Sequence, residues 1–265
     1  MMPDDKPGIA IIGGSGVYDP SLFENVKAVR VATPYGAPSG PIDVGDFMGV
    51  KIAFLPRHGK GHTLPPHMVP YRANIWALKS LGVERIISPC AVGSLQMKYR
   101  PGTIMLPDQF IDFTKGRQYT FYDGGKTVHV STADPFCPEL RKIIFDAGKK
   151  LNVPIFGKGT YITIEGPRFS TRAESRMFRQ FADIIGMTLN PEIQLAVEQE
   201  ICYASIAQIT DYDVWADHPV TQEEVFSTLQ KNLKRTQELL KAVIPLVPAG
   251  RTRCACGGSM KNAEV

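Results

Sequence analysis

Two carboxylates separated by one residue stand out in the last third of the chain. Residues 203–209 read as a buried strand, and Thr210, Asp211 and Asp213 follow it directly. In open α/β sheets, ligands bind beyond the carboxyl ends of strands. A protonated carboxyl group there can donate a proton to a leaving group. An ionised carboxylate can instead accept a hydrogen bond from an amine. The alternative is an ordinary solvated turn, in which Asp is common.

Three further strand candidates are followed by segments suited to an anion. The segments after residues 8–12, 50–55 and 84–88 are Gly13-Gly14-Ser15-Gly16, Arg57-His58-Gly59-Lys60 and Cys90-Ala91-Val92-Gly93. Glycine lets backbone N–H groups converge on an anion, and a guanidinium matches phosphate geometry. Singly, each segment also fits a tight turn or a solvated basic loop. Three such strand ends together favour one common site.

Helix signals alternate with these strands. Residues 71–81, 138–151 and a segment starting at Pro191 read as helices, with Glu192 placed to interact with the helix dipole. Capping boxes at 171–174 and 221–224 start two more helices, and the second is long and ends near Pro245. The alternation predicts an α/β fold. Residues 1–265 are expected to form a single domain, with loose termini at 1–7 and 248–265.

Composition excludes several classes of protein. The chain has 265 residues and a net charge of +4, and it lacks a basic run or a basic-aromatic ladder, so nucleic acid is not an expected partner. No stretch approaches the ~18 apolar residues of a membrane span, and the polar start does not resemble a signal peptide. We therefore expect a cytoplasmic protein. The sequence also lacks GxGxxG and GxxxxGK[ST], which disfavours a module that binds NAD or ATP.

Motifs along almost the whole chain give a family resemblance. They include RHG at 57–59, YRANIWALKSLG at 71–82, AVGSL at 91–95, DPFCP at 134–138, TIEGPRFSTRAES at 163–175 and TDYDVW at 210–215. The chain resembles the trimeric-type purine nucleoside phosphorylases, and within them the group that acts on S-methyl-5′-thioadenosine. The resemblance implies a central mixed sheet partly closed into a barrel and flanked by helices. It also implies that phosphate attacks a nucleoside and releases the base, with no metal or organic cofactor.

The resemblance also assigns roles to residues. Phosphate donors would come from Ser15, Arg57, His58, the Ala91 backbone and Thr188, with Thr210 as a further donor. Position 90 departs from the family, which usually has Thr or Asn there, because a Cys thiol is a weak donor. A nucleophilic role for Cys90 is disfavoured, since phosphorolysis needs no covalent step. Met187 would pack under the ribose and Phe169 near the base or sugar, although both also fit the core.

The remaining assignments concern the base and the 5′ end. Asp211 and Asp213 would bind the purine at N7 and N6 and favour 6-amino purines. Val225 occupies a place where inosine-cleaving relatives have a histidine, which suits a methylthio group. His129 would come from a neighbouring subunit, so a homotrimer or a hexamer is expected. The implied reaction converts S-methyl-5′-thioadenosine and phosphate to adenine and S-methyl-5-thio-α-D-ribose 1-phosphate. A methylthioinosine or broad 6-oxopurine phosphorylase is the alternative.

Five cysteines remain to be placed. No CxxC pair occurs, so a structural zinc site is not expected, and His58, His62 and His67 lack carboxylate partners for a metal. We expect Cys254 and Cys256 to form a disulfide with each other or with other cysteines. Cys137–Cys202 is a second pairing, because the family packs those segments centrally. Reduced thiols in an ordinary cytosol are the alternative.

Overall fold

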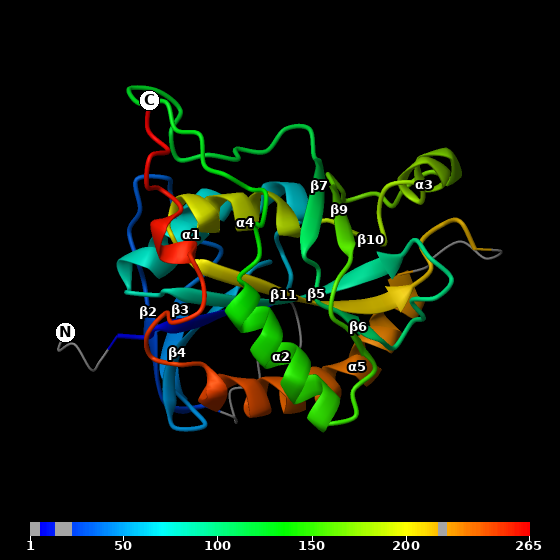
Figure 1. The fold of residues 1–265 in the computed structure, drawn as a ribbon, viewed down its shortest axis with the longest axis horizontal. Coiled ribbons are helices and arrows are strands. Elements are labelled where there is room, and N and C mark those ends of the chain that lie inside the picture. The colour runs from blue at the N-terminus through cyan, green and yellow to red at the C-terminus, as the bar shows by residue number, and fades with distance from the viewer. Residues whose placement is uncertain (1–5, 14–22, 217–221) are drawn as a thin grey trace.

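The structure is a computed structural model that describes residues 6–13, 23–216 and 222–265. Eleven described strands form one mixed sheet, and Figure 1 shows helices on both sides of it. The strands are β1 (Ile9–Gly13), β2 (Glu24–Val29), β3 (Ile42–Phe47), β4 (Val50–Pro56), β5 (Arg85–Ser94), β6 (Ile104–Met105), β7 (Gln109–Phe113), β8 (Ile155–Phe156), β9 (Thr160–Ile164), β10 (Ile184–Gly186) and β11 (Cys202–Asp211). This confirms the α/β class.

The main path through the sheet is β2-β3-β4-β1-β5-β10-β9-β7, and β11, β6 and β8 branch from β5. Strands β4, β1, β5 and β11 run parallel, whereas β2 and β3 pair antiparallel. Among the described strands, β2, β7 and β8 each pair on one side only. The expected mixed sheet is therefore present, but it is not a closed barrel.

Strand β1 shows why the central strands are apolar throughout. Successive side chains of a strand point to opposite faces. Ala10 and Ile12 pack in one core cluster and Ile9 and Ile11 in another. Both faces are covered, as expected for a parallel sheet. Figure 1 shows α1 (Tyr71–Ser80) and α4 (Leu189–Glu198) on one face, with α2 (Pro138–Lys150) and α5 (Gln222–Val243) on the other.

The predicted capping box at 171–174 is confirmed at the start of α3 (Arg172–Phe178). The Thr171 hydroxyl accepts a hydrogen bond from the Glu174 N–H at 3.1 Å, and the Glu174 carboxylate accepts one from the Thr171 N–H at 2.7 Å. These two bonds satisfy N–H groups that the first turn of a helix leaves open. The second predicted capping box begins at Thr221, outside the described residues.

Two predicted boundaries differ from the structure. The small residues after Ser88 were expected to form a loop, but β5 continues to Ser94 because β11 pairs alongside as far as Gly93. Strand β11 also begins earlier than predicted, at Cys202, and ends on Asp211. The sequence did not suggest the 3₁₀ turns found among the described residues, which are η3 (Pro66–Met68), η4 (Ile244–Leu246) and η5 (Cys256–Gly258).

The C-terminal segment at 248–265, which the sequence led us to expect to be loose, makes hydrogen bonds to the rest of the molecule. The Thr252 hydroxyl donates to the Glu139 carboxylate at 2.9 Å, and the Ser259 hydroxyl donates to the Val197 carbonyl at 2.6 Å. Residues 1–5 of the other expected loose terminus lie outside the described residues. No helix in the described parts of the chain has the length and apolarity needed to cross a membrane.

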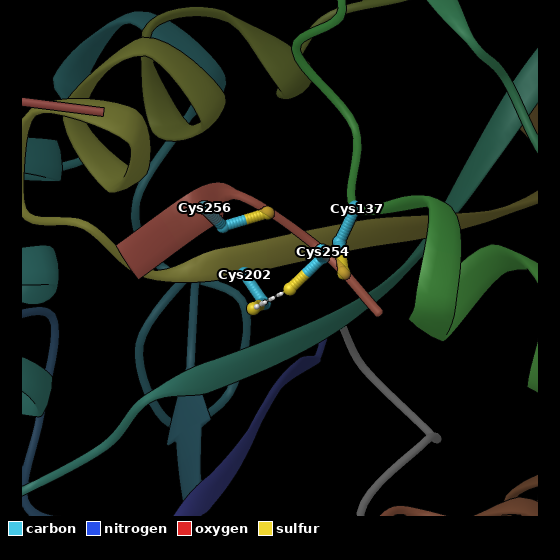
Figure 2. A group of neighbouring side chains, drawn as sticks. All are labelled: Cys137, Cys202, Cys254 and Cys256. Atoms are coloured by element: carbon cyan, nitrogen blue, oxygen red, sulfur yellow. Dashed lines mark hydrogen bonds between the residues drawn. The ribbon is translucent and has the colours of Figure 1, made fainter. Parts of the chain in front are cut away.

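Four of the five cysteines, including both from the C-terminal segment, gather at one place. The sulfur atoms of Cys137, Cys202, Cys254 and Cys256 all lie within 4.8 Å of one another, and Figure 2 shows the four side chains converging. The structure thus brings together the residues that we expected to pair. The Cys202 and Cys254 sulfurs are 3.5 Å apart, which is longer than a disulfide bond of about 2.05 Å. The disulfides therefore stay a prediction.

Candidate active site

The carboxyl ends of β1 and β4 meet, as the sequence predicts. Gly13 pairs with Pro56, and the Arg57 N–H donates to the Gly13 carbonyl at 3.0 Å. Strand β1 therefore ends next to Arg57. Ser15, the candidate phosphate donor in that segment, lies outside the described residues.

Arg57 is buried, with 1% of its surface exposed, and its guanidinium is held on several sides. Nε donates to Glu192 Oε2 at 2.7 Å, and Nη2 donates to Glu192 Oε1 at 2.9 Å and to the Ser88 hydroxyl at 2.5 Å. Nη1 lies 3.4 Å from the Pro89 carbonyl oxygen. Burial lowers the pKa of Arg57, but the Glu192 carboxylate outweighs burial and raises the pKa above its ordinary value. Arg57 is thus a fixed positive charge.

Glu192 is a site residue that sequence reasoning missed. The sequence suggested only a helix-dipole role, whereas the carboxylate is fully buried in α4 and points at Arg57. Its Oε1 also accepts hydrogen bonds from the Ser88 hydroxyl at 2.9 Å and the Tyr203 hydroxyl at 2.7 Å. An acidic residue in the middle of an apolar helix face was the available signal, because a buried charge needs a partner.

His58, the next residue, is buried and neutral. Its Nδ1 lies 2.8 Å from the Leu64 carbonyl oxygen, which can only accept, so Nδ1 carries the proton. Burial, and then the neighbouring Arg57 charge, lowers the pKa of His58 to about 4. The other ring nitrogen, Nε2, is therefore an acceptor at neutral pH. The sequence led us to expect a donor at His58, whereas this tautomer offers an acceptor at Nε2, and the contact of His58 with phosphate stays a prediction.

Cys90, Ala91 and Thr188 lie on the strands and the turn around Arg57. Ala91 pairs with Gln208 of β11, and Thr188 is buried at the junction between β10 and α4. The Cys90 sulfur lies 3.5 Å from the Ser205 hydroxyl, and burial raises the pKa of the Cys90 thiol. A protonated thiol is a poor nucleophile, so the structure supports the expectation that Cys90 has no covalent role.

Asp211 and Asp213 are brought together at the carboxyl end of β11. Asp211 accepts hydrogen bonds from the Thr210 hydroxyl at Oδ2 and from the Asp213 N–H at Oδ1, both at 2.7 Å. Both carboxylate oxygens of Asp211 therefore accept a hydrogen bond from a neighbouring group. Asp213 is buried, and its Oδ2 has no hydrogen-bond partner among the described residues. Burial raises the pKa of the Asp213 carboxyl. The two carboxyls therefore differ in their hydrogen bonding, and Asp213 keeps its proton to higher pH than an exposed carboxyl.

Met187 lies against the loop that carries Phe169. A Cβ on Gly166, whose φ is +67°, would fall 2.7 Å from the Met187 sulfur, so only glycine allows this approach. Phe169 is 42% exposed, which disfavours the alternative of a core role within this chain. A pocket of about 200 Å³ opens beside this loop and is lined by Phe113, Lys115, Ile164, Glu165, Gly166, Arg168, Glu174 and Phe178.

Two further predicted residues, Val225 and His129, come from other parts of the chain. The Val225 backbone lies in α5, but its side chain is outside what the structure describes. His129 is exposed, and its N–H donates to the Ala263 carbonyl at 2.8 Å. It lines a shallow depression of about 850 Å³ formed by residues 119–132 and their neighbours. We call residues 119–132 the arm. Figure 1 shows the arm beside the C-terminus, at the opposite end of the view from the arrowhead of β11.

Comparison with known proteins agrees with this fold. A family model described as "Phosphorylase superfamily" matches residues 8–245. The chain belongs to the phosphorylase superfamily.

Similar sequences and solved structures show to which group of the superfamily the chain belongs. It is 60% identical over 259 residues to the S-methyl-5′-thioadenosine phosphorylase of Pyrococcus horikoshii, covering 98% of this chain and 100% of that protein. A methylthioadenosine phosphorylase from an antarctic soil metagenomic library has a similar structure, with a TM-score of 0.93, 45% identity, and coverage of 98% and 93%. The Schistosoma mansoni methylthioadenosine phosphorylase in complex with adenine matches with a TM-score of 0.88, 39% identity and 93% coverage of both chains. Within the superfamily, the chain belongs with the S-methyl-5′-thioadenosine phosphorylases.

Proposed function

We propose that the protein cleaves S-methyl-5′-thioadenosine with inorganic phosphate, giving adenine and S-methyl-5-thio-α-D-ribose 1-phosphate. The observation that carries the proposal is the pair Asp211 and Asp213, one held as an acceptor and the other buried with a raised pKa. Such a pair suits a 6-amino purine that must leave as a neutral base. Relatives up to 60% identical over their full length carry the name of this activity.

Phosphate would bind where β1 and β4 end, beside Cys90 and Ala91 of β5. Arg57 supplies a fixed positive charge, and Ser15, the Ala91 N–H and Thr188 supply donors. Neutral His58 adds an acceptor, since Nδ1 is committed to Leu64. HPO₄²⁻ carries one P–OH proton that such an acceptor can take as a hydrogen bond. Thus Arg57 and His58 together favour the dianion in one orientation, with an unprotonated oxygen free to attack C1′.

At the base, Asp213 would donate its proton to N7 as the glycosidic bond breaks. Asp211 would accept a hydrogen bond from the exocyclic N6 amine. Proton donation leaves adenine neutral and removes the charge that slows its departure. An ionised Asp211 would repel the O6 of hypoxanthine or guanine, which explains a preference for adenine. Cys90, a weak donor, and Thr210 would border the phosphate from β5 and β11.

The ribose and its 5′ group would lie between Met187, Phe169 and Val225. An apolar Val225 suits a methylthio group and leaves a 5′-hydroxyl without a partner, which costs about 1–3 kcal/mol. His129 would reach this region from a neighbouring subunit, because its own arm lies at the other end of the molecule (Figure 1). We therefore include a homotrimer or a dimer of trimers in the proposal, with phosphate as co-substrate, no organic cofactor and a cytoplasmic location.

A substrate panel tests the proposal. Methylthioadenosine, adenosine, methylthioinosine, inosine and guanosine are assayed with and without phosphate, and base release is followed by chromatography. We expect release that depends strictly on phosphate and the highest kcat/KM for methylthioadenosine. Faster cleavage of methylthioinosine, inosine or guanosine would favour the alternative, a 6-oxopurine phosphorylase. Release without phosphate would contradict both.

A further inference from the structure

Arg117 is a buried cation that the proposed chemistry does not use. A guanidinium has five N–H groups, and the Arg117 side chain makes five hydrogen bonds. Nε donates to Glu165 Oε1 at 2.9 Å, and Nη2 donates to the Glu165 carbonyl at 2.6 Å and to the Ile164 carbonyl at 3.4 Å. Nη1 donates to the Asn190 carbonyl at 2.6 Å and to the Tyr71 hydroxyl at 3.1 Å. The side chain is 2% exposed, so its donors are committed inside the protein.

The acceptors belong to three separate elements. Glu165 is the first residue after β9, Asn190 lies near the start of α4, and Tyr71 is the first residue of α1. Asn190 has an extended backbone inside the span of α4, with φ of −98° and ψ of 136°. A helical carbonyl accepts from the N–H four residues on, and an extended residue turns its carbonyl away from that direction. Arg117 therefore supplies the partner that a buried carbonyl requires.

Two of these acceptors lie beside the residues that we propose for the sugar. Glu165 opens the loop that leads to Phe169, and Asn190 follows the turn that holds Met187. The loop and the turn approach each other at Gly166, where an added Cβ would fall 2.7 Å from the Met187 sulfur. One guanidinium thus bridges both sides of the proposed sugar site.

We propose that Arg117 is a positioning residue for the nucleoside: its guanidinium fixes the distance between Phe169 and Met187, between which the ribose and its 5′ group would lie. This inference rests on the proposed function and adds the residue that sets the width of the sugar site. Arg117 acts through the backbone of Glu165 and Asn190, since all five of its N–H groups already have acceptors.

The start of the loop is held from two sides. Glu165 Oε2 accepts hydrogen bonds from the N–H groups of Lys115 and Gly116, which directly precede Arg117. Glu165 therefore lies between that backbone and the Arg117 guanidinium. A carboxylate bonded through both oxygens cannot turn away without breaking several hydrogen bonds at once, so the segment at 115–117 fixes the start of the loop.

The proposed phosphate residues have anchors of their own. Glu192, in α4, accepts hydrogen bonds from Arg57, Ser88 and Tyr203. These bonds hold Arg57 independently of Arg117. Loss of the Arg117 guanidinium should therefore displace the sugar residues more than the phosphate residues.

Arg117→Lys in the full chain tests the inference. Lysine keeps the charge but presents its donors at one point, and it cannot reach acceptors on three elements. We expect a higher KM for methylthioadenosine and a kcat/KM lowered by about 10²-fold, which is the effect of a displacement of about 1 Å. The KM for phosphate should stay unchanged. The Kd for adenine, which lacks the sugar, should also stay at its wild-type value in equilibrium binding.

Arg85→Lys is the matched control. The Arg85 side chain is also 2% exposed, and it lies 3.8 Å from the carboxylate of Glu139. Arg85 is the first residue of β5, whereas the proposed site lies toward the carboxyl ends of the strands. We expect a lower melting temperature with wild-type kinetics. A wild-type KM for methylthioadenosine in Arg117→Lys, or equal increases of both KM values, would overturn the inference.

Glu165→Gln keeps the test decisive if Arg117→Lys fails to fold. It leaves the backbone acceptors of Arg117 in place and removes only the charge paired with Nε. The KM for methylthioadenosine should rise by a smaller factor, with the KM for phosphate unchanged, and wild-type kinetics would again overturn the inference. Failure of the proposed function would appear instead in the wild-type protein, as no release of adenine from methylthioadenosine and phosphate. The same variants would then be compared on the nucleoside that the wild-type protein cleaves.

Discussion

The Arg57 guanidinium and the Glu192 carboxylate form a double hydrogen bond inside the protein, with Nε–Oε2 at 2.7 Å and Nη2–Oε1 at 2.9 Å. Both side chains are 1% exposed. The pair joins the end of β4 to α4, and Thr188 stands at the start of that helix. Glu192 therefore sets the position of a charge that we assign to phosphate, although it need not touch phosphate itself.

Glu192→Gln should raise the KM for phosphate more than the KM for the nucleoside. Gln keeps one acceptor and the side-chain shape but loses the charge that holds the Arg57 fork. Breaking a buried ion pair costs about 3–5 kcal/mol of stability, so melting temperature is recorded alongside steady-state kinetics.

Arg57→Ala should weaken phosphate binding directly, by about 1.5–3 kcal/mol.

Asp46→Asn is the control for these variants. It removes an ion pair with Lys51, at 3.3 Å, in which both side chains are 27% exposed. Such a pair contributes about 0–1 kcal/mol, and both KM values should stay unchanged. Equal increases of the two KM values in Glu192→Gln would show that Glu192 only supports the fold.

Gly93→Ala should damage the base site and spare the phosphate site. A Cβ at Gly93 would lie 2.8 Å from Asp211 Oδ1, so the carboxylate would have to move. We expect a higher KM for methylthioadenosine, a smaller change in the phosphate KM, and a weaker preference for adenine over hypoxanthine substrates. Gly8→Ala is the matched control, because its Cβ meets nothing within 4 Å. A wild-type substrate preference in Gly93→Ala would contradict this placement of Asp211.

Much of the fold follows from local pattern. The apolar runs at residues 8–12 and 50–55 have a covered face on both sides, and this is why they read correctly as central strands. Strand β2 was not predicted, because almost all of its residues are exposed and no apolar alternation marks it. The residues that we propose for the site could be found in part from the same local patterns. The end of a strand can be recognised from the local sequence. Arg57, Asp211 and Asp213 were found because each lies at or just after the end of a strand.

Long-range pairings were beyond the sequence. Glu192 meets Arg57 across 135 positions, and Cys137, Cys202 and Cys254 meet only through the packing of α2, β11 and the C-terminal segment. Each of these residues has an ordinary local explanation, as a helix-dipole partner or a reduced thiol. Only the three-dimensional structure shows that the ordinary explanation is incomplete.

His58 should make stability depend on pH in mildly acidic solution. Its pKa is lowered from 6.5 to about 4 in the folded protein, so the unfolded chain takes up a proton first as pH falls. The contribution is complete above pH 6.5 and is lost between there and about pH 4, a change of about 3 kcal/mol. Melting curves of wild type and His58→Asn across this range should converge at the acid end. Parallel curves would contradict a buried neutral imidazole.

Asp213 should act as the proton donor, and Asp213→Asn should lower kcat for methylthioadenosine by about 10²–10⁴-fold. Burial raises the pKa of Asp213, so its protonated form persists to higher pH than an exposed carboxyl. Its contribution to stability is present at low pH and is lost as pH rises through the raised pKa. The kcat for methylthioadenosine should fall over the same pH interval, since only the protonated form of Asp213 donates.

Asp211→Asn should instead change the ratio of kcat/KM for adenine substrates to kcat/KM for hypoxanthine substrates, and it should keep the pH profile. A wild-type pH profile in Asp213→Asn, with kcat intact, would assign the proton transfer to another group, and Asp211 would be the first to examine.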